Sequence, residues 1–284
     1  MTQGLAIWHY PHRTIADNIR YFAAQGFEAV SAHGAQLVQA LLSEQGASIA
    51  EALRQGGVQF TVHYTLPKSH AEEHVATYKT GIEALAAWQN TYGLIKILSF
   101  DVPAPIRDGI ASYVDVALAE VQGCFVAVED FGLTPEERAQ IEHLKENPRF
   151  GYLLDIGHMF IRLKGRNTSG KPLFTNQTDE CPASENPGYN EFLRAMASKE
   201  FPVFEMHLHN NDGEKDLHWF LEEGALDIPM IARVVRDMGF DGIMTIESAP
   251  GFRFECRGAD ADEGIMKTFD YWKECCKKKC SSST

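Results

Sequence analysis

The chain has 284 residues, and its 44% hydrophobic and 23% charged side chains are ordinary globular usage, which excludes a disordered chain. Asp and Glu number 39 against 26 Lys and Arg, and the formal net charge of −13 disfavours generic binding to a nucleic-acid backbone. The sequence opens without a basic, apolar leader, and it contains no apolar run of about 18 residues. We therefore expect a cytoplasmic protein that does not enter the membrane.

Eight short apolar runs alternate with amphipathic segments and predict eight strands joined by helices. Thr14, Ser48, Ser69 and Thr134 each stand three residues before a carboxylate and are predicted helix N-caps. Alternating strands and helices require a parallel sheet, and eight such units in about 250 residues favour the α/β class and one closed (β/α)8 TIM barrel. The runs are 4–10, 28–34, 58–64, 94–100, 124–130, 150–156, 203–209 and 242–248.

A single barrel domain is expected over 1–272, followed by a flexible tail over 273–284. Residues 162–190, rich in Gly, Pro and Asn, follow the sixth predicted strand directly. Because a barrel carries its active-site loops at that end, we interpret 162–190 as an inserted active-site loop. The tail has a cysteine cluster without a second C-x-x-C half, which favours a frayed terminus over a metal site.

Carboxylates end several of the predicted strands. Glu129, Asp155 and Glu247 each close an apolar strand that points to the same mouth of the barrel. Three unpaired carboxylates would repel one another there, whereas a divalent cation removes the repulsion and His207 offers it a nitrogen ligand. These four residues therefore predict a metal site.

Five segments in register carry a family resemblance. They are VAVED (126–130), LLDIGHMF (153–160), EMHLHNNDGEKDLHW (205–219), EEGALD (222–227) and DGIMTIES (241–248). Together they resemble the xylose isomerase-like TIM-barrel superfamily, which contains sugar-phosphate isomerases, sugar epimerases and endonuclease IV. The resemblance covers roughly 124–248. Apart from His63, the earlier residues match the superfamily only in the alternation of predicted strands and helices.

The resemblance implies that Glu129, Asp155, His207 and Glu247 hold one divalent metal ion, which is Mn, Mg, Co or Zn. It further implies that Glu129 and Glu247 are the catalytic acid and base. The expected activity is that of an isomerase or epimerase of carbohydrate metabolism, acting on a sugar, sugar phosphate or keto-polyol. A proton leaves the carbon next to a carbonyl, and a metal-bound enediolate forms. Isomerisation and epimerisation both stay open.

Further residues are predicted to contact the substrate. By resemblance, His158 binds a substrate hydroxyl, and Trp8 is interpreted as a pocket wall for a sugar ring. Arg253 and Arg13 are candidate handles for a phosphate or carboxylate. His209, beyond the seventh strand, is interpreted as structural. The predicted substrate-binding set is His158, His63, Asp216, His218, Arg253 and Trp8.

Two other reactions stay open beside this one. An endonuclease IV-like multi-zinc phosphodiesterase is supported because His63, Asp216 and His218 match positions that bind further zinc ions in that enzyme. It is opposed by the acidic composition and by 99–101, Ser-Phe-Asp, which stand where that enzyme has another histidine ligand. A dehydratase would begin with the same proton abstraction. A barrel that only binds a small molecule is a third hypothesis, which the intact set of four predicted metal ligands disfavours.

The expected partner is a small sugar-like molecule rather than nucleic acid or membrane, and a homo-oligomer is compatible with the sequence.

Overall fold

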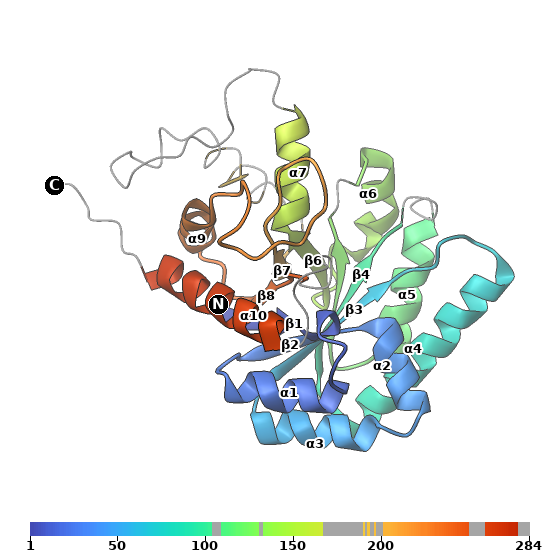
Figure 1. Ribbon diagram of the computed structural model, residues 1–284. Helices are drawn as coiled ribbons and strands as arrows, with labels where there is room; N and C mark the ends of the chain where they lie inside the picture. The colour runs from blue at the N-terminus through green and yellow to red at the C-terminus, as the bar shows by residue number, and fades with distance from the viewer. Residues whose placement is uncertain are drawn as a thin grey trace.

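Eight parallel strands close into a barrel in which each strand pairs with the next along the chain and β8 pairs with β1 (Figure 1). The strands are β1 Thr2–Ala6, β2 Ala29–His33, β3 Gln59–Thr65, β4 Ile95–Asp101, β5 Phe125–Glu129, β6 Phe150–Asp155, β7 Val203–Leu208 and β8 Ile243–Ile246. The predicted (β/α)8 barrel is therefore confirmed. The structure is a computed structural model, and it describes residues 1–103, 109–130, 133–166, 190, 192, 193, 196, 201–249 and 259–277.

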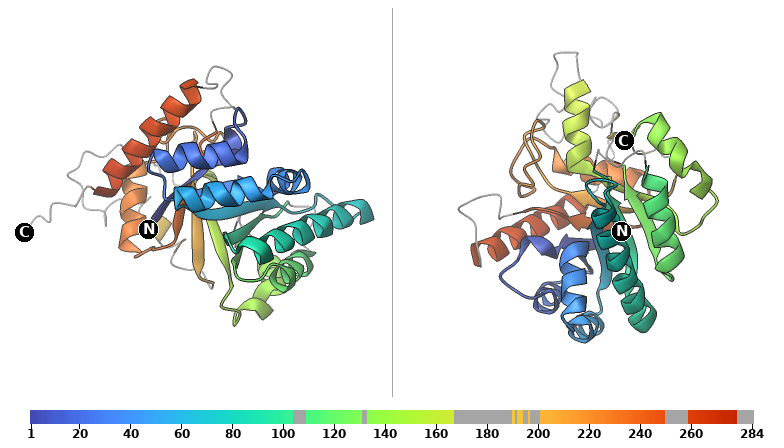
Figure 2. Two further views of the ribbon diagram at one scale, coloured as in Figure 1. Left: turned by 90° about the horizontal axis from the view of Figure 1, so that it is seen from below. Right: turned by 90° about the vertical axis from the view of Figure 1, so that its right-hand side faces the viewer.

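Helices surround the barrel and cover its outer face (Figure 2). Neighbouring helices pack in pairs, α1 against α3 and α9 against α10. In the described part of the chain, no helix combines the length and apolar composition needed to cross a membrane. The helices are α1 Ile15–Ala24, α2 Gly34–Leu42, α3 Gly46–Gly56, α4 Glu72–Tyr92, α5 Ile110–Glu120, α6 Pro135–Ile141, α7 Ile156–Arg166, α9 Ile228–Asp237 and α10 Ala259–Lys277.

Three boundaries differ from those predicted. The first strand ends at Ala6, and a 3-10 turn over Ile7–His9 lifts Trp8 out of the sheet. The helix α7 continues to Arg166, so the first residues of the expected loop 162–190 are helical, and most of the loop lies outside the described residues. The helix α10 continues to Lys277, so the expected tail begins as helix, with Cys275 buried.

On several strands, the side chains that face the barrel interior change from apolar to ionisable toward the carboxyl end of the strand. On β8 they run from Ile243 through Thr245 to Glu247, just past the strand end, because alternate residues face the same side of a strand. On β5 and β6 the same change ends at Glu129 and Asp155. The closed end of the barrel interior is thus apolar and the carboxyl-terminal mouth is ionisable, so the fold itself places the candidate site.

Two of the four predicted N-caps are confirmed. Thr14 accepts the backbone N–H of Asp17, and Thr134 forms a reciprocal capping box with Glu137. Ser48 and Ser69 do not cap their helices, and both predictions are wrong. The Ser48 hydroxyl donates back to the carbonyl of residue 45 inside the first turn, and the Ser69 hydroxyl accepts the N–H of residue 71 in a turn before α4.

The difference between Thr14 and Ser48 is measurable in the free energy of unfolding. Replacing Thr14 with Ala removes the acceptor for an N–H of α1, and we expect a loss of about 1 kcal/mol. Replacing Ser48 with Ala removes no cap and is expected to change stability by less than about 0.5 kcal/mol. Urea unfolding followed by circular dichroism measures both, and equal losses would contradict the cap assignments.

Candidate functional site

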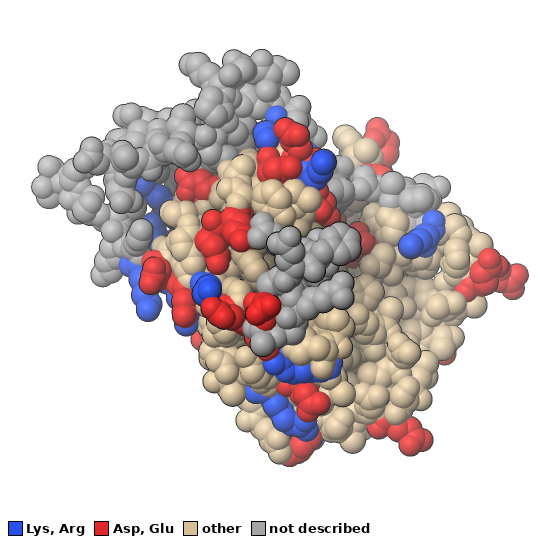
Figure 3. All heavy atoms as spheres, in the orientation of Figure 1, with Lys and Arg blue, Asp and Glu red and all other residues tan. Residues whose placement is uncertain are grey.

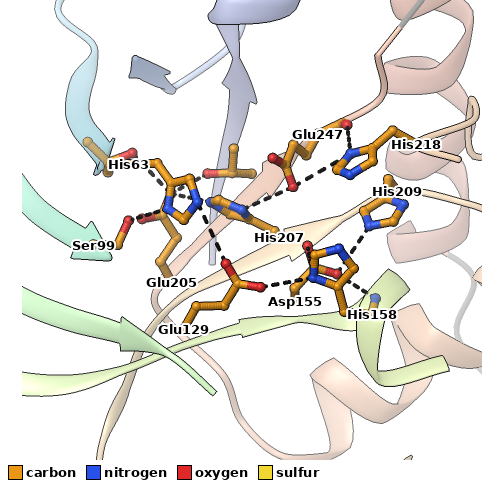
Figure 4. A network of polar contacts seen from close by, with 12 residues as sticks. His63, Ser99, Glu129, Asp155, His158, Glu205, His207, His209, His218 and Glu247 are labelled. Atoms are coloured by element: carbon orange, nitrogen blue, oxygen red, sulfur yellow. Dashed lines mark hydrogen bonds and ion pairs between the residues drawn. The ribbon is translucent and has the colours of Figure 1, made fainter. Parts of the chain in front are cut away.

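Ionisable side chains converge at the carboxyl-terminal mouth of the barrel (Figure 4). They come from strand ends, from the first turn of α7 and from the segment after β7. All are buried or partly buried except Asp216, whose side chain is half exposed. Because such groups are rarely buried without partners, their convergence marks a candidate active site. The members are His63, Glu129, Asp155, His158, His207, His209, Asp216, His218 and Glu247.

The junction between β6 and α7 places Asp155 and His158. Asp155 ends the strand, and its Oδ1 accepts the backbone N–H of His158 at 2.7 Å, as an N-cap residue does. The D-x-x-H spacing therefore puts His158 in the first helical turn beside that carboxylate. His158 Nδ1 also lies 2.9 Å from Oε1 of Glu129, which ends the neighbouring strand β5.

Asp155, His207 and Glu247 form a candidate metal site in which every member is buried. Each offers one ligand atom, and the three atoms lie within 4.8 Å of one another. All three residues are buried, and His207 Nδ1 is 3.2 Å from Glu247 Oε2. Glu129, the fourth residue of the predicted set, groups instead with Asp155 and His158. The structure thus gathers three of the four predicted ligands and links the fourth to them through Asp155.

The polar atoms of this group fit a divalent ion. Within the described residues, neither ring nitrogen of His207 makes a hydrogen bond, and neither does Oδ2 of Asp155, although both residues are buried. Two ligands about 2.1 Å from one ion lie about 3.0 to 3.4 Å apart, which matches the separation of His207 Nδ1 and Glu247 Oε2. A nitrogen with two carboxylates suits Mn²⁺, Co²⁺ or Zn²⁺.

The carboxyl groups of the site differ in their pKa. Burial raises the pKa of Glu129 to about 7, and the hydrogen bond with His158 only partly offsets this effect. Burial acts on Asp155 and Glu247 in the same direction, but the charges of nearby histidines outweigh it and hold both pKa values below the usual range. At neutral pH, Glu247 is therefore ionised while Glu129 exchanges a proton readily.

A second cluster lies beside the first and comprises His158, His209, Asp216 and His218. Their ligand atoms also lie within 4.8 Å of one another. Asp216 bridges two of the rings, with Oδ2 3.1 Å from His158 Nε2 and Oδ1 3.0 Å from His218 Nε2. The rings of His209 and His218 stack with centroids 3.8 Å apart. His218 Nδ1 donates to the carbonyl of Glu247 at 2.9 Å, so Nε2 faces Asp216.

The segment after β7 brings this second cluster together. The backbone of Asn210 exchanges hydrogen bonds with Trp219, which folds the segment back over the mouth. The Asn210 side-chain amide donates to the carbonyls of Leu221 and Leu226 and fixes the return of the chain. His218 adopts a φ of 45°, a backbone conformation that is uncommon for residues other than glycine. Positions far apart in the loop are thereby held together.

Two other predicted residues line the same mouth. His63 Nδ1 lies 3.1 Å from the Ser99 hydroxyl and Nε2 lies 3.6 Å from Glu129 Oε2. Burial lowers the pKa of His63 to about 3, so its ring is neutral. The indole of Trp8 stacks on His63, with centroids 5.9 Å apart, and lies 6.2 Å from the ring of His207. Trp8 therefore stands next to the candidate metal ligands.

The structure describes only one of the two arginines that were predicted to bind a phosphate or carboxylate of the substrate. Arg13 forms a paired hydrogen bond with the carboxylate of Asp262 and lies over the ring of Tyr21. Its charge is thus already neutralised within the protein, which disfavours a role as a handle for a ligand. Arg253 lies outside the described residues.

One buried carboxylate of the barrel interior, Glu205, was not predicted from the sequence. It is fully buried on β7 and lies 3.6 Å from His207 Nε2. The alternation in EMHLH could have identified it, because residues 205, 207 and 209 share one face of the strand. The same alternation brings His209, interpreted from the sequence as structural, to the second cluster.

Comparison with known proteins gives a family and several relatives of the fold. The sequence profile described as xylose isomerase-like TIM barrel matches residues 19–275. An uncharacterized protein of Methanocaldococcus jannaschii is 24% identical over 140 residues, which span 47% of this chain and 40% of that protein. The match thus spans less than half the length of that relative.

Two solved structures share the barrel. D-psicose 3-epimerase from Clostridium cellulolyticum H10 superposes with a TM-score of 0.62 at 11% identity, covering 98% of this chain and all of that one. The 3-keto-D-glucoside 4-epimerase YcjR from E. coli gives a TM-score of 0.63 at 15% identity, covering 97% of this chain and all of that one. At these identities the likeness establishes the fold.

The metal site predicts that chelator-treated protein binds about one Mn²⁺ or Co²⁺ per chain and becomes more stable to heat. An ion at 100 times its Kd would add about 2.7 kcal/mol to the free energy of unfolding. We expect Asp155→Asn to abolish this gain, because the amide still caps α7 but is a poor metal ligand. Titration calorimetry and differential scanning calorimetry measure the two effects.

The matched control is Asp115→Asn, which alters another aspartate–histidine pair, with His143, on the surface. This variant is expected to bind the ion as the unaltered protein does. Equal melting temperatures with and without metal, or equal loss in the control, would contradict the assignment.

Proposed function

Because the chain belongs to the xylose isomerase-like TIM barrel family, we propose that it is a divalent-metal-dependent epimerase or isomerase of a small sugar or sugar derivative. The sugar epimerases with the same barrel support this class of substrate. The reaction would begin with removal of a proton from the carbon next to a carbonyl. Localisation in the cytoplasm and a role in carbohydrate metabolism are part of this proposal.

One observation carries the proposal: two glutamates enter the site from strands on either side of the candidate metal ligands. Glu129 ends β5 and Glu247 follows β8, while Asp155 and His207 lie on the intervening β6 and β7. Two carboxylates on opposite sides of a substrate can remove a proton from one face and return it to the other. This placement favours epimerisation, whereas a single carboxylate shuttling the proton between adjacent carbons would give isomerisation.

Asp155, His207 and Glu247 would hold the ion. Glu129, which groups with Asp155 and His158, would be the fourth ligand. When bound, a divalent ion polarises the substrate carbonyl and stabilises the negative charge that develops on its oxygen. Before an ion binds, burial raises the pKa of Glu129 to about 7, so its carboxyl group can take up or release a proton near neutral pH. His158 orients the Glu129 carboxylate through the 2.9 Å contact, and Trp8 offers a flat apolar wall to the substrate.

Glu247 would be the second proton-transfer group. Before an ion binds, the charges of His207 and His218 hold the pKa of Glu247 below its usual range, so its carboxylate is ionised and can accept a proton. When two carboxyl groups in one site have different pKa values, one can remove a proton from the substrate while the other donates one.

The second cluster favours a second candidate function, a multi-zinc phosphodiesterase. Three histidines and Asp216 gathered beside the first site can hold a further ion. Against this function, Ser99 stands beside His63 where a further histidine ligand would be needed. On the face shown in Figure 3, the described Lys and Arg side chains are interspersed with Asp and Glu and form no continuous basic area.

Solvent exchange tests the proposed reaction. In D₂O with Mn²⁺, we expect deuterium to enter a ketose or ketose phosphate at the carbon next to the carbonyl, detected by NMR. Glu129→Gln and Glu247→Gln are expected to lower the exchange rate by at least about 100-fold, because each removes a proton-transfer group. The control Glu142→Gln alters an exposed carboxylate paired with Lys145 and is expected to exchange at the normal rate.

The competing functions give different results in the same assays. Loss of water from the substrate would indicate a dehydratase. Cleavage of a phosphodiester that is lost in His218→Ala, with no carbon-bound deuterium in any ketose tested, would contradict the epimerase and favour the phosphodiesterase.

A further inference from the structure

Glu205 is fully buried inside the barrel, two residues before His207 on β7, and its side chain lies beside those of His63 and His207 in Figure 4. Its Oε1 accepts hydrogen bonds from the hydroxyl of Thr61 at 3.0 Å and from that of Thr245 at 2.6 Å. These donors come from β8, which is next to β7, and from β3 across the barrel, so two strands fix the carboxylate in the barrel interior. Its Oε2 makes no hydrogen bond with any residue that the structure describes.

Glu205 faces the ring of His207. Both residues lie on the inward side of β7, and Glu205 Oε1 is 3.6 Å from His207 Nε2. On the other edge of the ring, Nδ1 is 3.2 Å from Glu247 Oε2 at the candidate metal site. The ring is therefore held between one carboxylate in the interior and another at the mouth. At 3.6 Å the interior contact is longer than a hydrogen bond, so the attraction is electrostatic.

A buried carboxylate is costly unless other groups stabilise it. Thr61 and Thr245 stabilise Glu205 through hydrogen bonds. Its one ionisable contact in the described part of the chain is Nε2 of His207, whereas Nδ1 of the same ring faces Glu247. A carboxylate in that position favours the tautomer with a proton on Nε2 and leaves Nδ1 free to bind a cation.

We propose that Glu205 is a positioning residue: together with Thr61 and Thr245 it fixes the orientation and tautomer of His207, so that Nδ1 is presented to a divalent cation beside Asp155 and Glu247. This inference rests on the metal site of the proposed function. Glu205 does not touch the substrate, and its contribution is to metal affinity.

The test compares the Kd for Co²⁺ and Mn²⁺, measured by titration calorimetry on the full chain. Glu205→Gln keeps an acceptor for the two threonines but removes the charge, and we expect it to weaken binding by about 10- to 100-fold. Thr245→Val removes the shorter of the two hydrogen bonds and leaves His207 untouched, so a smaller loss is expected. Thermal unfolding of each metal-free variant shows whether the fold is kept.

The matched control is Ser31→Ala. Ser31 is equally buried in a strand of the same barrel, and its hydroxyl makes no hydrogen bond in the described structure. Its removal is expected to leave the Kd unchanged. A further readout is the ring ¹⁵N spectrum of the Zn²⁺-loaded protein, in which His207 is expected to carry its proton on Nε2, and in Glu205→Gln this signal is expected to broaden or shift.

The outcomes separate the two levels of the proposal. If the unaltered protein binds no divalent ion, the metal site and the role of Glu205 both fail. If it binds the ion and the folded Glu205→Gln protein binds it equally well, the role of Glu205 alone is overturned. If Ser31→Ala weakens binding as much as Glu205→Gln does, the effect is a general one of the interior and the positioning role is also overturned.

Discussion

The central constraint on this structure is that several buried carboxylates lie close together at one mouth of the barrel and must be stabilised there. Parallel strands bring Glu129, Asp155 and Glu247 together at their carboxyl ends, where burial and mutual repulsion both oppose ionisation. In the described part of the chain, the ion pairs that these three residues make are all with histidines. Histidine, unlike lysine or arginine, can give up its proton to bind a metal, so the same contacts that stabilise the mouth can also form a metal site.

Much of this arrangement could be predicted from the sequence because it follows from strand periodicity. A carboxylate that ends an apolar run must lie at the mouth of a parallel barrel, and Glu129, Asp155 and Glu247 were identified in that way. The alternation in EMHLH places Glu205 on the same face of the strand as His207, but the two threonine donors that explain its burial are distant in sequence and could not be predicted.

The second cluster could not be predicted as a unit. Asp216 and His218 lie in an irregular segment whose path depends on the Asn210 side chain and on the left-handed backbone of His218. Such tertiary contacts override local pattern, as they also do at α3, where the helix begins two residues before the expected cap. The sequence therefore predicted a set of candidate residues at the barrel mouth, while the structure determines which of them lie together.

The most direct measurement of the central claim is anomalous X-ray diffraction from crystals of the protein soaked in Mn²⁺. We expect a peak between the side chains of Asp155, His207 and Glu247, at ligand distances of about 2.0 to 2.3 Å. A peak only among His158, Asp216 and His218, or none at the barrel mouth in protein that crystallises with its fold intact, would contradict the central claim.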